Sequence, residues 1–256
     1  MIWNVDPILF TLGPVSIRYY GLCFMVSFLS GYYIMAWIYK KEDQPLSSLE
    51  SLFTYMFLGT LIGARLGHVL FYQPDYYFSN PIEIFKVWHG GLASHGAAVG
   101  ICTALFLFCR KHPDQKLVWV MSRMCIVVAL AGFFIRLGNF FNSEIYGVQT
   151  TVPWAVTFLQ IDNVPRHPTQ LYESFSYLLI FVLMLAYYNK YRAKANSYIL
   201  LGFFFTTVFT ARFLLEFTKD YQADFEHSLP LHMGQILSIP LVLVGIGLMI
   251  VGENKK

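Results

Sequence analysis

Charged residues are scarce in this sequence. They make up 13% of its 256 residues, whereas hydrophobic residues make up 56% and aromatic residues 18%. A soluble domain carries roughly 25% charged residues, so a water-exposed fold of this length would lack the polar side chains to cover its surface. The apolar excess also excludes an intrinsically disordered chain, which has too little apolar surface to fold. What remains is a protein embedded in a membrane.

Basic stripes and cysteine motifs are also missing, and we expect no signal peptide. The net charge is only +3 and is dispersed, which excludes the basic face of a nucleic-acid-binding protein. No C-x-x-C spacing occurs, and the cysteines lie in apolar stretches, so we interpret them as small buried hydrophobic residues. They are Cys23, Cys102, Cys109 and Cys125. Residues 1–16 have no basic region ahead of an apolar one, and we expect them to form a short surface segment.

Seven apolar stretches are long enough to cross a bilayer, which takes about 20 helical residues. They are predicted to be helices because a lone strand in lipid would leave its backbone polar groups without partners. The spans are expected at residues 17–39, 49–72, 91–110, 117–138, 168–189, 197–217 and 234–252. The sequence therefore predicts an all-α integral membrane protein, with one polytopic domain over residues 1–256 and seven transmembrane helices.

Lysine and arginine are unequally divided between the connecting loops. The connections after the first, third and fifth spans and the C-terminal tail are basic, whereas the opposite loops contain only Lys86, Arg166 and Lys219. Because basic loops stay in the cytoplasm, we predict an external N-terminus and a cytoplasmic C-terminus. The external loops are the longer ones, so a function located in loops would face the periplasm or the cell exterior.

Several ionisable residues fall within the predicted spans or at their edges. A central arginine costs about 2.5–3.5 kcal/mol to insert, so each needs a partner or water. Such groups are functional candidates, and an internal salt bridge that fixes helix packing is the alternative. For Arg123, near the basic side, we favour packing or a side chain that reaches the membrane surface. The residues are Arg65, Arg123, Arg136, Arg212, Glu173 and Glu216, with Glu144 just beyond a span.

Two of these arginines have informative neighbours. Arg212 and Glu216 are four residues apart and share one helix face, in a pair that is either structural or functional. Arg65 lies among glycines at four-residue intervals, and this spacing lets helices approach closely. We expect Arg65 to have an anionic partner, since it lies between two close-packing glycines.

Two segments at the external ends of spans combine polar groups. Residues 136–147 contain Arg136, Asn139 and Glu144: a guanidinium and an amide that suit a phosphate, and a carboxylate that can orient the guanidinium. Residues 166–173 read RHPTQLYE and open the fifth span from the same side. Together the two segments predict an external, phosphate-sized anion site at the level of the lipid head groups.

A third segment, residues 88–96, lies at the mouth of the third span. Its histidines, His89 and His95, are six residues apart and do not share a helix face, and no further zinc ligands lie at workable spacing. We interpret His95 as a base or a hydrogen-bond donor, with a structural histidine as the alternative.

Seven segments, in order along the chain, resemble the motifs of the prolipoprotein diacylglyceryl transferase family, bacterial inner-membrane enzymes that begin lipoprotein maturation. The resemblance implies transfer of the diacylglyceryl group from phosphatidylglycerol to the lipobox cysteine thiol of a prolipoprotein, with release of glycerol 1-phosphate. It places the active site toward the periplasmic side and requires no cofactor and no metal, because the lipid carries the leaving group and the cysteine is the nucleophile. The segments are 18–22, 63–72, 89–96, 136–147, 166–173, 212–216 and 233–240.

The resemblance also implies roles for single residues. Arg136 and Arg212 would bind the phosphate, and Glu144 and Glu216 would hold those guanidinium groups in place. His95 would act as general base or as a positioning group. The catalytic set is Tyr20, His95, Arg136, Asn139 and Arg212. The lipid- and phosphate-binding set is Arg65, Arg136, Asn139, Glu144, Gly147, His167, Gln170, Arg212 and Glu216.

Two positions depart from the family pattern, and two other function classes stay open. Val208 replaces a frequent tyrosine, and His89 stands where some members carry aspartate, which argues against His89 as the indispensable base. A transporter or lipid flippase would distribute charges across the membrane depth and usually has repeated halves, whereas no strong internal repeat is present. A structural membrane subunit would tolerate neutral replacement of the arginines and of His95.

Overall fold

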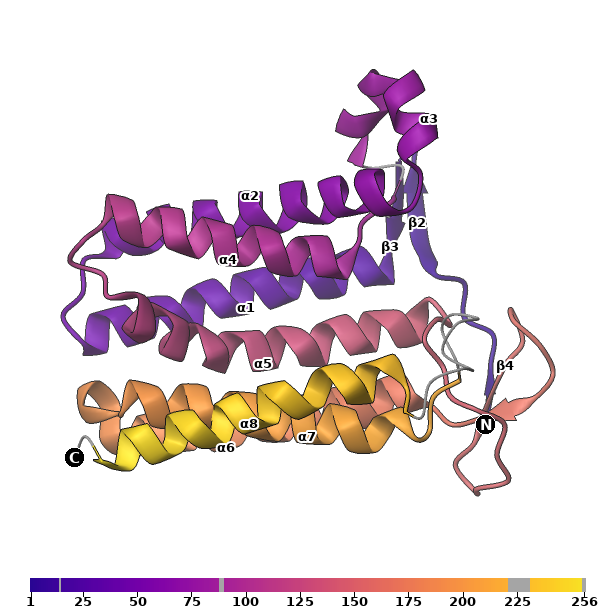
Figure 1. Cartoon of the computed structure of the whole chain (residues 1–256). Helices are drawn as coiled ribbons and strands as arrows, with labels where there is room; N and C mark the ends of the chain where they lie inside the picture. Colours follow the sequence, from indigo (N-terminus) through magenta and orange to yellow (C-terminus); the bar gives the residue numbers. More distant parts are fainter. Residues whose placement is uncertain (14, 88–89, 221–230, 255–256) are drawn as a thin grey trace. The chain divides into compact units, whose positions relative to one another are not determined.

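The structure is a computed structural model that describes residues 1–13, 15–87, 90–220 and 231–254 (Figure 1). The helices are α1 (Tyr19–Lys41), α2 (Leu46–Phe71), α3 (Pro74–Ser79), α4 (Ser94–Lys111), α5 (Leu117–Phe141), α6 (Thr169–Tyr191), α7 (Ser197–Glu216) and α8 (Met233–Asn254), with 3₁₀ helices η1 (Pro81–Phe85) and η3 (Arg192–Lys194). The strands are β1 (Ile2–Trp3), β2 (Ile8–Leu12), β3 (Val15–Arg18), β4 (Val156–Phe158) and β5 (Pro165–Arg166).

The seven long helices begin and end within three residues of the predicted spans. Among the described residues, six helical segments are long and apolar enough to cross a membrane: α1, α2, α5, α6 with η3, α7 and α8. The exception is α4, which has 18 residues and includes His95, Arg110 and Lys111. The structure therefore supports an integral membrane protein, and the seventh crossing stays a prediction.

The chain divides into two compact units. Unit 1 contains Met1–Ile38 and Met121–Lys256, and unit 2 contains Tyr39–Val120. Unit 1 thus includes the five strands, helices α6, α7 and α8 and most of α1 and α5, whereas unit 2 includes α2, α3, η1 and α4.

In unit 2, glycines bring α2 and α4 side by side at backbone contact (Figure 1). A Cβ atom at Gly63 would lie 2.8 Å from the Cα of Gly100, and one at Gly67 would lie 2.7 Å from the Cα of Gly96. These distances are too short for any larger side chain. The prediction that this glycine spacing serves close helix packing is confirmed.

Replacing Gly100 with valine is expected to destabilise the protein strongly. A Cβ there would lie 2.9 Å from the Cα of Gly63 and closer still to the carbonyl oxygen of Gly59. Because backbone cannot move aside as a side chain can, we expect a cost of at least about 3 kcal/mol, or roughly 10 °C in melting temperature. The control is Gly247→Val in α8, where a Cβ meets nothing within 4 Å. Equal melting temperatures of the two variants in detergent would contradict this packing.

In unit 1, successive helices run antiparallel. Tyr19 near the start of α1 stacks on Phe141 at the end of α5, with ring centroids 4.6 Å apart. In α6, Ser174 Oγ donates to the carbonyl oxygen of Phe133 in α5 at 3.0 Å. Helices α7 and α8 lie side by side (Figure 1). This arrangement brings the end of α5, the start of α6 and the end of α7 to one end of the unit.

Strands β1, β4 and β5 lie at this end of unit 1, and no strand was among the predicted elements. Strand β1 pairs in parallel with β4, β4 pairs antiparallel with β5, and β2 and β3 form a hairpin. Phe140, Val156 and Phe158 form a buried cluster against which Trp3 packs. Much of the expected surface segment therefore forms strands, and the helices of the predicted all-α membrane fold carry this small β-cap. Strands of two to five residues are too short to show a readable alternation.

Candidate active site

Arg136, near the end of α5, forms a buried ion pair with Glu173 of α6. Its Nε lies 2.9 Å from Glu173 Oε2, and the two side chains are 14% and 1% exposed. Another guanidinium nitrogen donates to Asn139 Oδ1 at 3.2 Å. The direct carboxylate partner of Arg136 is therefore Glu173. The expectation that Glu144 would hold Arg136 is corrected, since Glu144 reaches it through Asn139.

Glu144 lies in a strained turn that several hydrogen bonds fix. Asn139 Nδ2 donates to Glu144 Oε1 at 2.7 Å, and Gln170 Nε2 donates to the Glu144 carbonyl oxygen at 2.7 Å. Both neighbours of Glu144, Ser143 and Ile145, have positive φ angles of 54° and 56°. A β-branched residue rarely adopts this conformation, and strain of this kind gathers at functional sites.

Gly147 allows three segments to meet beside this turn. A Cβ atom there would lie 2.7 Å from His167 Cβ and 2.7 Å from Thr169 Cγ2, and it would collide with the carbonyl oxygen of Thr218. The amide of Gly147 donates to the His167 carbonyl oxygen at 2.9 Å. The structure thus gives Gly147 a backbone packing role at the junction of residues 147, 167 and 218.

Lys219 connects the carboxylates of two helices. Its Nζ lies 3.0 Å from Glu173 Oε1 and 3.0 Å from Glu216 Oε2, and its side chain is 2% exposed. The result is a buried chain of charges, Arg136–Glu173–Lys219–Glu216. From the sequence, Lys219 was interpreted only as a loop cation. Its position three residues after Glu216 was the available signal, because that spacing places side chains on one face of a helical turn.

Arg212 lies beside this chain without joining it. The structure pairs Glu216 with Lys219, so the predicted Arg212–Glu216 pair is corrected. The charge of Arg212 acts on the hydroxyl of Tyr177, which also faces Arg136. Within the described ranges, Arg212 has no ion pair, and it shares the Tyr177 hydroxyl as an electrostatic neighbour with Arg136.

Tyr20 belongs to the same group of residues. Its ring packs on α5 so closely that a Cβ at Gly138 would lie 2.9 Å from it, and its hydroxyl is within electrostatic range of Glu144 and Arg136. Unit 1 therefore assembles two guanidinium groups, a phenol, an amide and fixed carboxylates. Such a set suits a phosphate-sized anion. Histidine, cysteine and acidic side chains of the described residues form no cluster that could hold a metal ion.

Comparison with known proteins identifies the family. Residues 7–251 match the family model of prolipoprotein diacylglyceryl transferase. Proteins named phosphatidylglycerol–prolipoprotein diacylglyceryl transferase are similar over nearly their whole length. The one from Tolumonas auensis is 48% identical over 100% of this chain and 99% of its own, and the one from Chloroherpeton thalassium is 53% identical over 95% and 91%. A third, from Porphyromonas gingivalis, is 43% identical over 97% and 93%.

The chain belongs to the prolipoprotein diacylglyceryl transferase family. The predicted resemblance is thereby confirmed, and the apolar helices together with the family make the protein a multi-pass membrane protein. Three segments that carried the predicted resemblance, residues 136–147, 166–173 and 212–216, lie in unit 1 and contribute residues to the charged site.

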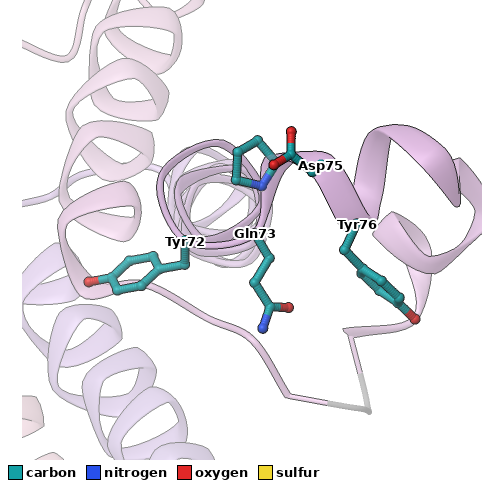
Figure 2. Close-up of a pocket in the computed structure, with 5 residues that line it drawn as sticks. Tyr72, Gln73, Asp75 and Tyr76 are labelled. Carbon is teal, nitrogen blue, oxygen red and sulfur yellow. The ribbon is translucent and has the colours of Figure 1, made fainter.

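Two candidate residues of this family member, His95 and Arg65, lie in unit 2. His95 is exposed in the first turn of α4, where its ring stacks on Tyr72 with centroids 5.8 Å apart and meets the edge of Phe71 at 5.3 Å. His89 lies outside the described residues. A cavity of about 400 Å³ lies between the end of α2 and the start of α3 and is lined by Tyr72, Gln73, Pro74, Asp75 and Tyr76 (Figure 2). No residue of the predicted catalytic set lines this cavity.

Arg65 is bound by backbone carbonyl groups. Its Nε donates to Ile84 O at 2.8 Å, one terminal nitrogen donates to Gly90 O at 2.6 Å and to Gly91 O at 3.1 Å, and the other donates to Glu83 O. Its guanidinium carbon also lies 4.8 Å from the ring centroid of Tyr77. The expectation of an anionic partner is corrected: carbonyl dipoles take that place. Arg65 ties residues 83–84 and 90–91 to α2, so its donors are already used within the protein.

Arg123 is a packing residue, as predicted. It is 1% exposed and donates to Ala195 O at 3.2 Å and to Ser197 Oγ at 3.1 Å. These acceptors lie at the turn between α6 and α7, so the guanidinium fixes that turn.

Arg166 pairs with Asp162 at the surface of unit 1, at 2.7 Å. The hydrogen bond from Arg166, supported by one from the Val164 amide, holds the pKa of the Asp162 carboxyl below its ordinary value. A carboxyl whose pKa is lowered by folding stabilises the protein at pH values above its ordinary pKa of about 4. This stabilisation is lost as the pH falls through the lowered pKa of the folded state.

Asp162→Asn is therefore expected to lower the melting temperature at pH 7 and to have no effect in acid. The pair is partly exposed, so the loss at pH 7 is below about 1 kcal/mol. Melting curves of both proteins from pH 7 downward test this. A gap that stays constant below about pH 4 would contradict the assignment.

Proposed function

We propose that this chain transfers the diacylglyceryl group of phosphatidylglycerol to the thiol of the lipobox cysteine of a prolipoprotein. The cysteine sulfur forms a bond to the glycerol carbon, the bond between that carbon and the phosphate oxygen breaks, and glycerol 1-phosphate leaves with the electron pair. The thiol proton passes to a base. The curated relatives carry the name of this reaction and match this chain almost from end to end.

The observation that carries the proposal is the fixed guanidinium of Arg136, which shares the Tyr177 hydroxyl as an electrostatic neighbour with Arg212. The leaving group is an anionic phosphate ester, which preorganised donors stabilise best. Glu173 fixes Arg136 from one side at 2.9 Å, and Asn139 accepts from it at 3.2 Å. Arg136 and Arg212 together would hold the phosphate, with Asn139 and Tyr20 contributing hydrogen bonds.

Lys219 and the carboxylates have a supporting role in this proposal. Glu173 accepts from Arg136 and from Lys219, while Lys219 also pairs with Glu216. These partners leave Arg136 in one position before the lipid binds. Such preorganisation favours catalysis, because part of the binding energy of the lipid would otherwise be lost in reorienting the guanidinium.

The thiol needs a base or a neighbouring positive charge, because its ordinary pKa is about 8.5. His95 is our candidate, either as that base or as a group that positions lipid or loop. Its exposure in α4 leaves the imidazole accessible. His95→Ala is expected to abolish transfer, and transfer at the wild-type rate would remove His95 from the mechanism.

We further propose seven membrane crossings, with α4 as the seventh, in the bacterial inner membrane. The basic loops then lie in the cytoplasm. This orientation places the end of α5, the start of α6 and the end of α7 on the periplasmic side, together with the charges that they carry. Both substrates are available there, since prolipoproteins are exported and the lipid belongs to the membrane.

A single assay separates this enzyme from the other function classes. The purified protein is incubated in vesicles with labelled phosphatidylglycerol and a lipobox peptide, and a peptide with serine in place of cysteine is the control. A thioether product confined to the cysteine peptide supports the transferase. Lipid movement without product would indicate a flippase, and neither outcome would indicate a structural subunit.

A further inference from the structure

We propose that Trp154 and Tyr172 hold the imidazole of His167 in one neutral tautomer, so that its Nε2–H donates to a phosphate oxygen of the lipid substrate. Trp154 and Tyr172 are then positioning residues. The inference rests on the proposed function for the identity of the ligand, but the tautomer itself is independent of it.

The three side chains form a line of hydrogen bonds in unit 1. Trp154 Nε1 donates to the Tyr172 hydroxyl oxygen at 2.7 Å, and His167 Nδ1 lies 3.1 Å from the same oxygen. An indole is only a donor, so Tyr172 must accept from Trp154. The hydrogen of the phenol is then left for a second bond, and His167 Nδ1 is the acceptor within reach.

This geometry favours one position of the proton on the ring. In a neutral imidazole one nitrogen accepts and the other carries the hydrogen. If Nδ1 accepts from Tyr172, Nε2 carries the hydrogen. The reverse arrangement would leave the Tyr172 hydrogen without an acceptor in the part of the chain that the structure describes. Within the same described ranges, His167 Nε2 has no protein partner, so its hydrogen is available to a ligand.

Backbone contacts place this donor at the corner of the charged site. The His167 amide donates to Val148 O at 3.1 Å, and its carbonyl oxygen accepts from Gly147 at 2.9 Å. Gly147 follows the strained turn of Glu144, and Val148 donates to Thr218 O at 3.0 Å, directly before Lys219. These contacts fix the backbone of His167 beside the segments that carry Glu144 and Lys219.

The chemistry of the ligand follows from the type of donor. A neutral N–H needs an oxygen that only accepts, and phosphate oxygens are such acceptors. In the proposed site the guanidinium groups of Arg136 and Arg212 would supply the charge, so His167 would add direction to the binding of the head group. Its loss should therefore raise the KM for phosphatidylglycerol and leave the KM for the peptide unchanged.

Two substitutions of His167 distinguish the two ring nitrogens. The amide nitrogen of glutamine reaches about as far as Nε2, whereas that of asparagine reaches only about as far as Nδ1. We expect His167→Gln to keep most of the activity and His167→Asn to lose about tenfold in kcat/KM, the effect of one hydrogen bond to a charged group. Equal activity of the two variants would overturn the assignment of the donor.

The tautomer is measured directly by ¹⁵N NMR of the full chain labelled at histidine. The signal of His167 is the one that His167→Gln removes. In the wild type we expect the Nε2–H form, and in Tyr172→Phe and Trp154→Phe we expect a mixture of forms. A wild-type Nδ1–H form, or a spectrum that Tyr172→Phe leaves unchanged, would overturn the proposal. If the wild type shows the expected form but transfers no lipid, the proposed function fails and the tautomer stands.

Discussion

Replacing Lys219 with methionine is expected to cost about 3–5 kcal/mol of stability and to abolish transfer. The substitution removes the shared cation between Glu173 and Glu216, which lie 3.0 Å from Nζ on either side and are almost fully buried. A buried carboxylate that loses its partner is costly, because water cannot replace the lost interaction. Melting temperature in detergent and the transfer of labelled lipid to a lipobox peptide measure the two effects.

Two further variants separate charge from packing at this position. Lys219→Arg keeps the cation and should retain most of the stability. Combining Lys219→Met with Glu216→Gln removes one carboxylate as well, so it should recover part of the stability that the single variant loses. If Lys219→Met melts like the wild type, the chain of charges does not support unit 1 as the structure indicates.

Arg136→Lys is expected to lower kcat/KM by about 10²–10³-fold while the protein stays folded. Lysine keeps the positive charge and can still pair with Glu173, but it cannot form the planar fork that a guanidinium offers to a phosphate. Removing one preorganised donor of a developing anion costs about this much. The kinetic measurement uses labelled phosphatidylglycerol, and the melting temperature checks the fold.

The matched control for this variant is Arg110→Lys. Arg110 is exposed in the last turn of α4, and the same exchange there should leave transfer unchanged. Wild-type transfer by Arg136→Lys would show that charge alone is sufficient at this position and would remove the proposed bidentate contact.

The helices could be predicted because their signals are local. Lys40 and Lys41 end α1, and the apolar stretches have the length of a bilayer, so the predicted boundaries lie close to the observed ones. The cap of α7 is local too: Asn196 accepts from the amides of Tyr198 and Ile199. Neither signal depends on which helix is the neighbour.

The partners of the charged groups could not be predicted in the same way. The sequence suggested Glu144 for Arg136 because the two are close in the chain, yet the antiparallel packing of α5 and α6 places Glu173 there instead. The groups that hold Arg65 are backbone carbonyl groups of residues 83–84 and 90–91, and a carbonyl group has no signature in a sequence. Residue types therefore predicted the chemistry of the site, and the packing of helices decided its pairs.

The left-handed backbone at Ser143 and Ile145 has a consequence for directed evolution. Glycine tolerates such φ angles without steric cost, so selection for heat tolerance alone should enrich glycine at either position. The same exchange would loosen the loop that presents Glu144, and enzymes often lose turnover when strained active-site segments relax. Thermostable clones that carry glycine there are therefore expected to be slow.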